Sequence, residues 1–556
     1  MRQILGVTSL PNRSRAAGMA AVILLFSAAC GRAETPDRQP PESAPALVLI
    51  VMIDQARADY LDRFGPLLTG GLRRLLDEGV VFTNAHHNHS YTATAPGHAA
   101  ISTGLYPRHS GIVANRWFSK ELRQEVYSVE DPQYLRSPRN LNGPTLGDWF
   151  KKQDPQAKVF AASQKDRSAV LLGGFMADGA YWYDDLTGTW TTSTYYADHG
   201  ADWLDRFNVE SWPDGLFGSS WDSLPLSKEQ MNEVGIIPAD YGWFEDHFPH
   251  PLGGATMQPD PQFYGDILNS PFADEFLAQL ALTIVREEQM GQRSSVDLLG
   301  LSFAALDYVG HSYGPDSAEV LDVVRRLDRV LGDLIIAIES IVGEERLYVG
   351  LSSDHGVPPL PEIQWTRDEL GTRTDIDDVL CLQQAGLELQ ERFEVRPLFL
   401  NGLYLNDEAI TAAGLSPEEI ENAAAGLMSR CEMVDRVWTR TQVRSDIWDD
   451  PNHDPMIERY HNNYYPGRSP DLMIHYTPYH LDYEGSGTTH GSAHDYDSHV
   501  PLIIRAAGLT AQIIAKRVYT VDLAPTLSAL LGVPYPKDLD GTDLGALFDR
   551  RPVLTP

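Results

Sequence analysis

Side chains that could bind metal ions occur at a few positions along the chain. These carboxylate and imidazole candidates are Asp54, Asp307, His311, Asp354, His355 and His490. A mixture of carboxylates and imidazoles without thiolates favours zinc over calcium or magnesium, which prefer ligand sets made of oxygen alone. Six protein ligands suit two metal ions, each with a position left open for a substrate or a nucleophile.

The three aspartates each follow a predominantly apolar run, and only the first of these runs is apolar without interruption. These runs cover residues 46–53, 296–303 and 347–351. Such runs suit strands that are covered on both faces, as in a parallel sheet, and helical patterns follow them. We therefore expect an α/β sandwich whose mostly parallel central sheet is flanked by helices. One aspartate at a strand end is usually a helix cap or a turn residue, but ligands collect at the carboxyl ends of such strands.

A hydroxyl and two cations add candidates for phosphate chemistry. Thr94 precedes a helix expected over 97–103, and a structural alternative for it is an N-cap. Lys165 and Arg167 are separated by one position, so on an extended segment both point the same way and can reach one phosphate. The alternative is that they are two solvated charges beside Asp166.

The order of these motifs resembles the alkaline phosphatase superfamily, and within it the periplasmic PafA-type phosphatases, which are related to nucleotide pyrophosphatase/phosphodiesterases. The matching motifs are MIDQ at 52–55, TAPGH at 94–98, GIVAN at 111–115, KDR at 165–167, Asp307 with His311, DHG at 354–356 and His490. The resemblance runs from Ile50 to about Leu531. It implies an alkaline-phosphatase-like sandwich with insertions.

The resemblance also implies two zinc ions and their ligands. One zinc is expected on Asp307, His311 and His490, and His499 is the rival to His490 in that set. The other is expected on a carboxylate and imidazole set completed by the Thr94 oxygen. The members of that second set are Asp54, Asp354 and His355.

By the same resemblance, Thr94 is the catalytic nucleophile and forms a phosphothreonine intermediate. Asn115, Lys165 and Arg167 are expected to bind the substrate phosphate. A monoester dianion gains more from a lysine and an arginine than a diester does, so we expect a phosphate monoester hydrolase of broad specificity that releases inorganic phosphate. The alternative is a phosphodiesterase or nucleotide pyrophosphatase with the same two-metal site. An arylsulfatase is excluded because a threonine cannot be converted to the aldehyde which that chemistry needs.

The composition limits the partners. The 556 residues carry a formal charge of −33, so we expect no binding to nucleic-acid polymers, whose phosphates demand Lys and Arg. An anionic substrate must therefore be attracted by local cations. Cys381 and Cys431 could form a disulfide or remain a pair of free thiols, and the sequence does not choose between these.

The beginning of the chain has the features of an export signal. Residues 1–30 combine a basic start with a short apolar run that ends at Cys30, as in a signal peptide of the lipoprotein type. Simple cleavage without a lipid anchor at Cys30 is the alternative. We expect a flexible tether over 31–45 and a catalytic domain over 46–556, with insertions at about 180–270 and 360–485. The predicted location is the periplasm, with the lipoprotein form anchored to the outer membrane.

Overall fold

The computed structural model describes residues 44–196, 202–210, 213–236, 248–254, 257–367, 369–445, 453–483 and 485–550. The described residues, from residue 44 onward, belong to one compact unit. The predicted signal peptide, Cys30 and residues 31–43 of the tether lie outside the described residues and remain predictions. Among the described helices, none has the length and apolar character needed to cross a membrane.

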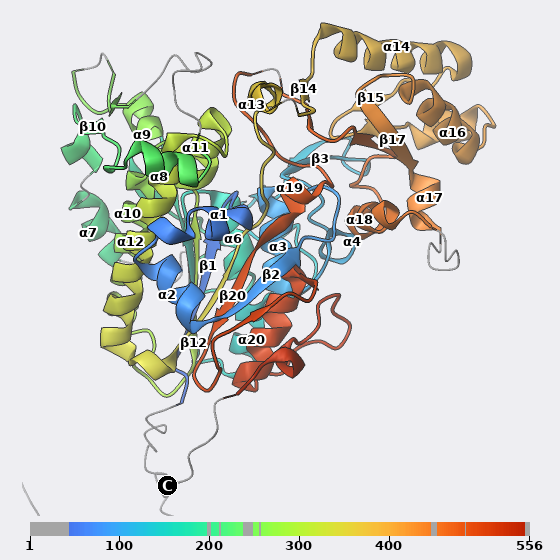
Figure 1. Cartoon of the computed structure of the whole chain (residues 1–556). Coiled ribbons are helices and arrows are strands. Elements are labelled where there is room, and N and C mark those ends of the chain that lie inside the picture. The colour runs from blue at the N-terminus through green and yellow to red at the C-terminus, as the bar shows by residue number, and fades with distance from the viewer. Residues whose placement is uncertain are drawn as a thin grey trace, which may run out of the picture. The chain divides into compact units, whose positions relative to one another are not determined.

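A ten-stranded sheet forms the centre of this unit (Figure 1). Its main path runs β21-β2-β20-β13-β1-β12-β7-β8-β9, and β22 also pairs with β2. The strands are β1 (Leu47–Ile53), β2 (Val80–His86), β7 (Val159–Ser163), β8 (Gly179–Asp184), β9 (Thr189–Thr191), β12 (Asp297–Phe303), β13 (Leu347–Ser352), β20 (His499–Arg505), β21 (Gln512–Ile514) and β22 (Val518–Tyr519). The five strands from β13 to β8 are mutually parallel, which confirms the predicted α/β sandwich.

Strand β1 shows why the apolar runs form this sheet. Its residues alternate between the two faces, so Leu47, Leu49 and Val51 enter one core and Val48, Ile50 and Met52 enter the other. Every residue of β1 is buried. Both faces are therefore covered, as the continuous apolar run predicts.

Helices on the two faces complete the layers. One core is closed by α2 (Gly71–Glu78), α10 (Phe272–Glu287), α11 (Ala305–Tyr313) and α12 (Ala318–Val342). The other is closed by α3 (Thr94–Thr103), α5 (Leu146–Gln153), α6 (Asp166–Gly173) and α20 (Leu523–Leu531). Shorter elements near these layers are α1 (Asp59–Arg63), α4 (Pro107–Ser110), α19 (Asp495–Ser498) and the hairpin of β3 (Arg116–Ser119) and β4 (Gln124–Tyr127).

The segment after β9 forms short elements that pack beside α10 and α12. They are α7 (Asp202–Val209), β10 (Ser220–Trp221), α8 (Lys228–Glu233), β11 (His250–Pro251) and α9 (Pro261–Leu268). A hydrogen bond joins this segment to α12, in which the buried indole N–H of Trp221 donates to Asp322 Oδ2 at 2.7 Å. The aromatic side chains of this segment thus extend the core that α12 covers.

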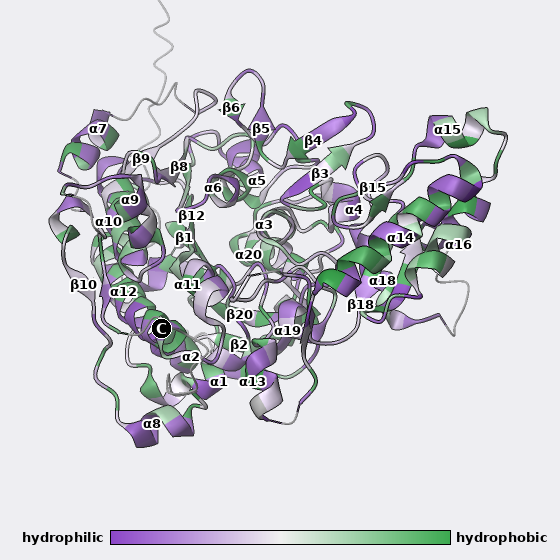
Figure 2. Ribbon diagram, turned by 90° about the horizontal axis from the view of Figure 1, so that it is seen from above, coloured by the Kyte–Doolittle hydropathy of each residue, from purple (hydrophilic) through white to green (hydrophobic). Residues whose placement is uncertain are grey.

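A second, smaller sheet lies within the predicted insertion at 360–485. Its order is β15-β16-β18-β17, from β15 (Leu398–Phe399), β16 (Leu403–Tyr404), β17 (Val434–Thr439) and β18 (Leu472–Tyr476). Helices of this segment include α13 (Pro361–Thr366), α14 (Ile376–Phe393), α15 (Asp407–Ala412), α16 (Pro417–Met428), α17 (Arg440–Arg444) and α18 (Pro455–Asn463), and a separate strand pair joins β14 (Thr372–Arg373) to β19 (His480–Leu481). A disulfide joins Cys381 to Cys431, which decides between the two readings of these cysteines. Figure 2 shows mixed hydropathy on α14, as expected for a helix packed on one face.

Candidate active site

Four neighbouring strands deliver charged side chains to one edge of the central sheet. Asp354 follows β13, Asp54 follows β1 and Lys165 follows β7. Asp307 comes after β12, in the first turn of α11. Because the four strands are parallel neighbours, their carboxyl ends lie together. All four side chains are buried.

The predicted metal ligands meet at this edge. The donor atoms of Asp54, Asp354 and His355 lie within 4.8 Å of one another, and this trio matches one predicted set. A second compact trio contains Asp307, His355 and His490. It differs from the prediction because His355 takes the place of His311.

His311 nevertheless contacts the second trio. His311 Nε2 lies 3.3 Å from Asp307 Oδ1, and His490 Nε2 lies 3.7 Å from the same oxygen. Asp307 and His311 are one helical turn apart on α11, so their side chains share a face of that helix. The structure therefore brings all the predicted protein ligands into one cluster.

Buried atoms without hydrogen-bond partners test whether this cluster suits a metal ion. Asp54 Oδ1, Asp354 Oδ2 and His355 Nε2 have no such partner among the described residues. His355 Nε2 lies 3.4 Å from the first oxygen and 3.5 Å from the second. Leaving such groups buried and unpaired is costly, and a divalent cation would satisfy all three. The donor set thus fits metal ions.

The electrostatics of Asp54 point the same way. Burial, reinforced by the neighbouring carboxylate of Asp354, raises the pKa of Asp54 well above its ordinary value. Lys165 and the nearby Asp307 act in opposite directions on it. A group in this position gains most from a cation that stabilises its charged form.

Backbone contacts set the tautomers of the three histidines. Nδ1 lies at hydrogen-bonding distance from a carbonyl oxygen in each ring: 2.7 Å from Thr488 for His311, 3.0 Å from Gly356 for His355 and 2.8 Å from Thr92 for His490. Since a carbonyl can only accept, each Nδ1 carries the proton. Each Nε2 is then left with the lone pair that a metal requires.

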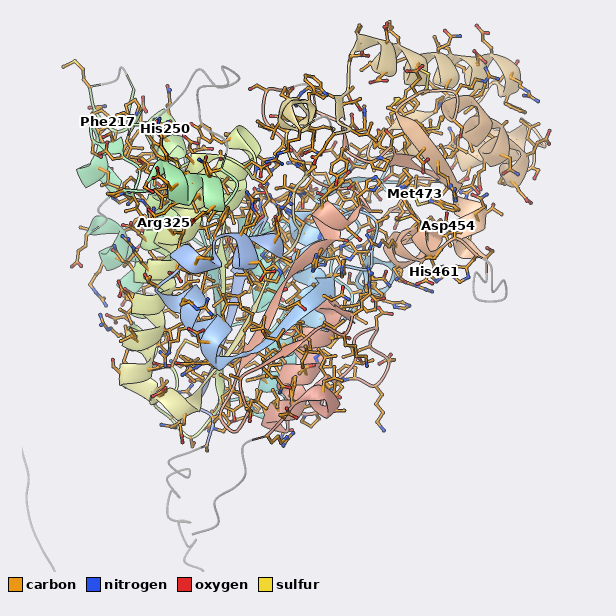
Figure 3. All side chains as sticks on the ribbon, in the orientation of Figure 1. Phe217, His250, Arg325, Asp454, His461 and Met473 are labelled. Carbon is orange, nitrogen blue, oxygen red and sulfur yellow. A yellow bond between two sulfur atoms is a disulfide. The ribbon has the colours of Figure 1, made fainter. Side chains whose placement is uncertain are left out.

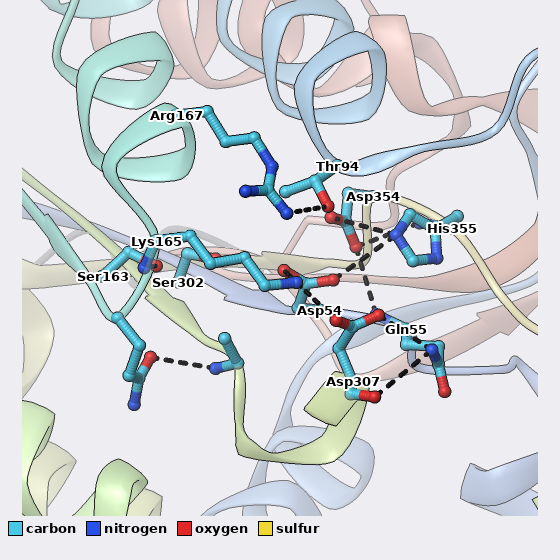
Figure 4. A network of polar contacts seen from close by, with 12 residues as sticks. Asp54, Gln55, Thr94, Ser163, Lys165, Arg167, Ser302, Asp307, Asp354 and His355 are labelled. Carbon is cyan, nitrogen blue, oxygen red and sulfur yellow. Dashed lines mark hydrogen bonds and ion pairs between the residues drawn. The ribbon is translucent and has the colours of Figure 1, made fainter. Parts of the chain in front are cut away.

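Thr94 is the first residue of α3, so this helix begins three residues before the predicted start. The N-cap is Ala93, and no side chain caps the helix. The N-cap reading of Thr94 is therefore wrong. Instead, Arg167 Nη2 donates to Thr94 Oγ1 at 3.3 Å (Figure 4). Asn115 lies beside the same turn, where its Oδ1 accepts from the Ala95 N–H at 2.8 Å.

Lys165 and Arg167 do not lie on an extended segment, so the reason given for their common direction is wrong. Lys165 is the N-cap residue of α6, and Arg167 is the second residue of that helix. The Lys165 ammonium donates to Asp54 Oδ2 at 2.6 Å and to Asp307 Oδ2 at 2.5 Å (Figure 4). Burial alone would lower the pKa of Lys165, but the two carboxylates outweigh it and the pKa is raised. The alternative that Lys165 is a solvated charge is wrong, because Lys165 is only 4% exposed.

Other histidines near the motifs have different positions. His499 Nε2 contacts the carbonyl of Thr83 on β2, and its ring stacks on His86, so it does not join the cluster. His98 was given no role from the sequence. Its ring bridges Thr94 O and Ser302 Oγ, both at 2.8 Å, and lies 3.3 Å from Asp354 Oδ2. The spacing of four residues between Thr94 and His98 on a helix is the signal that could have shown their contact.

Comparisons with known proteins agree with this arrangement. The family model described as type I phosphodiesterase / nucleotide pyrophosphatase matches residues 48–497. The chain belongs to this family. It is 30% identical to the alkaline phosphatase PhoV of Synechococcus elongatus, over 90% of this chain and 93% of that protein. It is 29% identical to the alkaline phosphatase PafA of Elizabethkingia meningoseptica, over 91% of this chain and 95% of PafA.

Solved structures of PafA share the fold. The wild-type enzyme superposes with a TM-score of 0.80 at 28% identity, covering 91% of this chain and 99% of PafA. A PafA variant substituted at a threonine, an asparagine, a lysine and an arginine superposes with a TM-score of 0.81. The predicted membership of the alkaline phosphatase superfamily, among the PafA-type proteins, is confirmed.

Proposed function

We propose that this chain hydrolyses phosphate monoesters by passing the phosphoryl group through Thr94. The observation that carries the proposal is the contact between the Arg167 guanidinium and Thr94 Oγ1 beside the carboxylate and imidazole cluster. The full-length relatives named as alkaline phosphatases support it. The four residue types substituted in the PafA variant also occur here in the same order, as Thr94, Asn115, Lys165 and Arg167.

Two zinc ions are the proposed cofactors. Asp54, Asp354 and His355, with the Thr94 oxygen, would hold one. The other would be held by Asp307, His311 and His490. Bound zinc supplies Lewis-acid stabilisation of negative charge on the attacking and leaving oxygens.

The protein's own residues perform the remaining steps. Thr94 Oγ1 loses its proton to solvent water and attacks phosphorus while the bond from phosphorus to the alcohol oxygen breaks, and the departing alcohol oxygen takes up a proton from water. A water molecule then attacks the phosphothreonine, which releases inorganic phosphate and restores the hydroxyl. Arg167 can bind two non-bridging oxygens at once, and the N-terminus of α3 favours negative charge at Thr94.

The preference for monoesters depends on Lys165 and Arg167. Both act on charge that a monoester dianion carries and a diester lacks. The alternative function is a phosphodiesterase or nucleotide pyrophosphatase with the same site, and the description of the matching family favours it. Paired aryl phosphate monoesters and diesters separate the two. We expect wild type to prefer the monoester, and Lys165→Ala/Arg167→Ala to lose most of that preference while diester turnover changes little.

Trapping the intermediate tests the nucleophile. Acid quenching during turnover of a monoester, followed by peptide mass spectrometry, should find phosphate on Thr94. Thr94→Ser should still be labelled, on serine, whereas Thr94→Ala should not be labelled. Label on Thr92 in the wild-type chain would refute the assignment, and a wild-type preference for the diester would refute the monoesterase.

A further inference from the structure

A cavity of about 570 Å³ lies between the smaller sheet and the edge of the active-site cluster. His490 belongs to both, because it lines the cavity and its Nε2 faces Asp307 Oδ1. Tyr91 and Ala114, which lie close in sequence to Thr94 and Asn115, also line it. The outer wall comes from residues 374–482, among them Met473 on β18, which is labelled in Figure 3. The cavity therefore adjoins the cluster on the side of His490.

Aromatic rings make up much of the cavity wall. These lining residues are Tyr91, Trp117, Phe399, Tyr404, Tyr460, Tyr476 and Tyr496. Phe399 is 39% exposed although it is large and apolar. Tyr91 Oη donates to Asn401 Oδ1 at 3.1 Å, so a residue close to the nucleophile touches the smaller sheet's segment directly. Rings arranged around a cavity can bind an apolar or cationic group through their faces.

All the formal charge on the described lining is negative. Asp378, Asp482 and Asp497 line the cavity, and no lysine or arginine does so among the described residues. Asp482 accepts hydrogen bonds only from hydroxyls, Thr374 Oγ1 at 3.1 Å and Tyr476 Oη at 3.0 Å. Asp378 accepts one backbone N–H as part of the cap of α14. Neither charge is neutralised by an ion pair in the part of the chain that the structure describes.

Asp497 is a buried carboxyl at the wall of the same cavity. Its side chain is 1% exposed, and Oδ1 has no hydrogen-bond partner among the described residues. The other oxygen is fully used, since Oδ2 accepts from Gly491 N, Ser492 N and Ser492 Oγ at 3.2, 2.8 and 2.6 Å. Burial raises the pKa of Asp497 from 3.8 to about 7, so near neutral pH this carboxyl adds less negative charge to the cavity than an ordinary aspartate would.

We propose that this cavity is the leaving-group subsite, and that it selects phosphate monoesters whose alcohol part carries an ammonium group. The inference rests on the proposed function and deepens it. An ammonium is attracted by Asp378 and Asp482 and by the faces of the aromatic rings. A carboxylate or a second phosphate on the alcohol part meets like charges, and no lysine or arginine lines the part of the cavity that the structure describes. The phosphoryl end is attracted by Arg167, so the two ends of the substrate are selected by opposite charges.

The test uses three aryl phosphates that differ only in a para aminomethyl, hydroxymethyl or carboxymethyl group. The measured quantity is the ratio of kcat/KM for the aminomethyl ester to that for the carboxymethyl ester. Comparing this ratio between proteins cancels the intrinsic reactivity of the esters. In Asp378→Asn/Asp482→Asn the ratio should fall about tenfold at low salt, and the difference from wild type should shrink as salt is added.

A matched control is Asp333→Asn/Glu345→Gln, which also removes two carboxylates, both exposed and outside the cavity lining. Its ratio should equal that of wild type. The inference is overturned if the double variant keeps the wild-type ratio, or if the control lowers it equally. Wild-type turnover of the neutral hydroxymethyl ester tests the proposed function separately. If that ester is not hydrolysed, the monoesterase proposal fails. If all three esters are hydrolysed and the kcat/KM ratio is the same in wild type and in the double variant, only the subsite proposal fails.

Discussion

Gly97, in the first turn of α3, has no room for a side chain. A Cβ added there would lie 2.2 Å from the carbonyl oxygen of Asp354 and 2.6 Å from its Cα and Cβ. Comfortable contacts between carbon atoms begin at about 3.5 Å, so Gly97→Ala must open a gap of roughly 1 Å. The displaced parts are the helix that begins at Thr94 and the backbone of Asp354, a proposed metal ligand.

The cost of Gly97→Ala should be larger for activity than for stability. Overpacking of this kind costs about 1–3 kcal/mol of unfolding free energy. A misplacement of roughly 1 Å between reacting groups costs about 100-fold in rate. We therefore expect kcat/KM for phenyl phosphate to fall by about two orders of magnitude in a chain that still unfolds cooperatively. Steady-state kinetics with zinc supplied, together with urea unfolding, measure the two effects.

Gly426→Ala is the control for the same chemical change in a helix. Gly426 lies in α16, and an added Cβ there has no atom within 4 Å. This variant should be stabilised by about 0.5–1 kcal/mol, because alanine favours helix more than glycine does. The reasoning is refuted if Gly97→Ala keeps kcat/KM within about twofold of the control.

Two further outcomes follow from buried groups and the disulfide. Burial raises the pKa of Asp274 from 3.8 to about 7, so the folded chain holds a proton that the unfolded chain releases. Unfolding free energy should therefore fall as pH rises between these values, and Asp274→Asn should remove that dependence; parallel urea-unfolding curves against pH for both proteins would contradict this. Cys381→Ser/Cys431→Ser should lose about 4 kcal/mol of unfolding free energy on the chain-entropy account, for a sequence separation of 50. An unchanged urea midpoint would show that the cross-link does not constrain the unfolded chain.

Removal of metal gives one more outcome. A chelator should lower both activity and the thermal midpoint, because Asp54, Asp354 and His355 then keep unpaired buried atoms, and added zinc should restore both. Differential scanning calorimetry checks the midpoint. Full activity after exhaustive dialysis against a chelator would exclude a catalytic metal.

Much of the central sheet could be predicted from the sequence because its strands are buried on both faces. The runs ending before Asp54, Asp307 and Asp354 contain enough adjacent apolar residues to identify strands by composition alone. The parallel arrangement then placed those three aspartates together. The resemblance of the ordered motifs to a known family also predicted the residues of the candidate site, although the compact trio contains His355 where His311 was expected.

Helix starts were harder to predict. A helix was expected over 97–103, directly after Pro96, yet α3 starts at Thr94. A proline in the first turn removes an N–H that has no partner within the helix, so it does not delay the start. The turn between β7 and α6 is similarly short, so Lys165 is the N-cap residue and Arg167 already lies in the helix, where an extended segment was expected.

Contacts between distant segments gave no signal in the sequence. Gly97 against Asp354 is a packing relation across 257 residues, and Tyr91 against Asn401 spans 310. The disulfide depended on how α14 and the residues after α16 are brought together. Such relations depend on tertiary packing, which neither periodicity nor local spacing encodes.

The order β13-β1-β12-β7 has a consequence for how this protein can change over evolution. Backbone hydrogen bonding sets neighbouring strands about 4.8 Å apart. The separation of Asp354, Asp54 and Asp307 is therefore determined by the main chain, which substitution of surface residues does not alter. The segment that forms the outer wall of the cavity lies between β13 and β20 in the sequence. Selection for new alcohols can thus rebuild that segment while the distances that the chemistry requires stay constant.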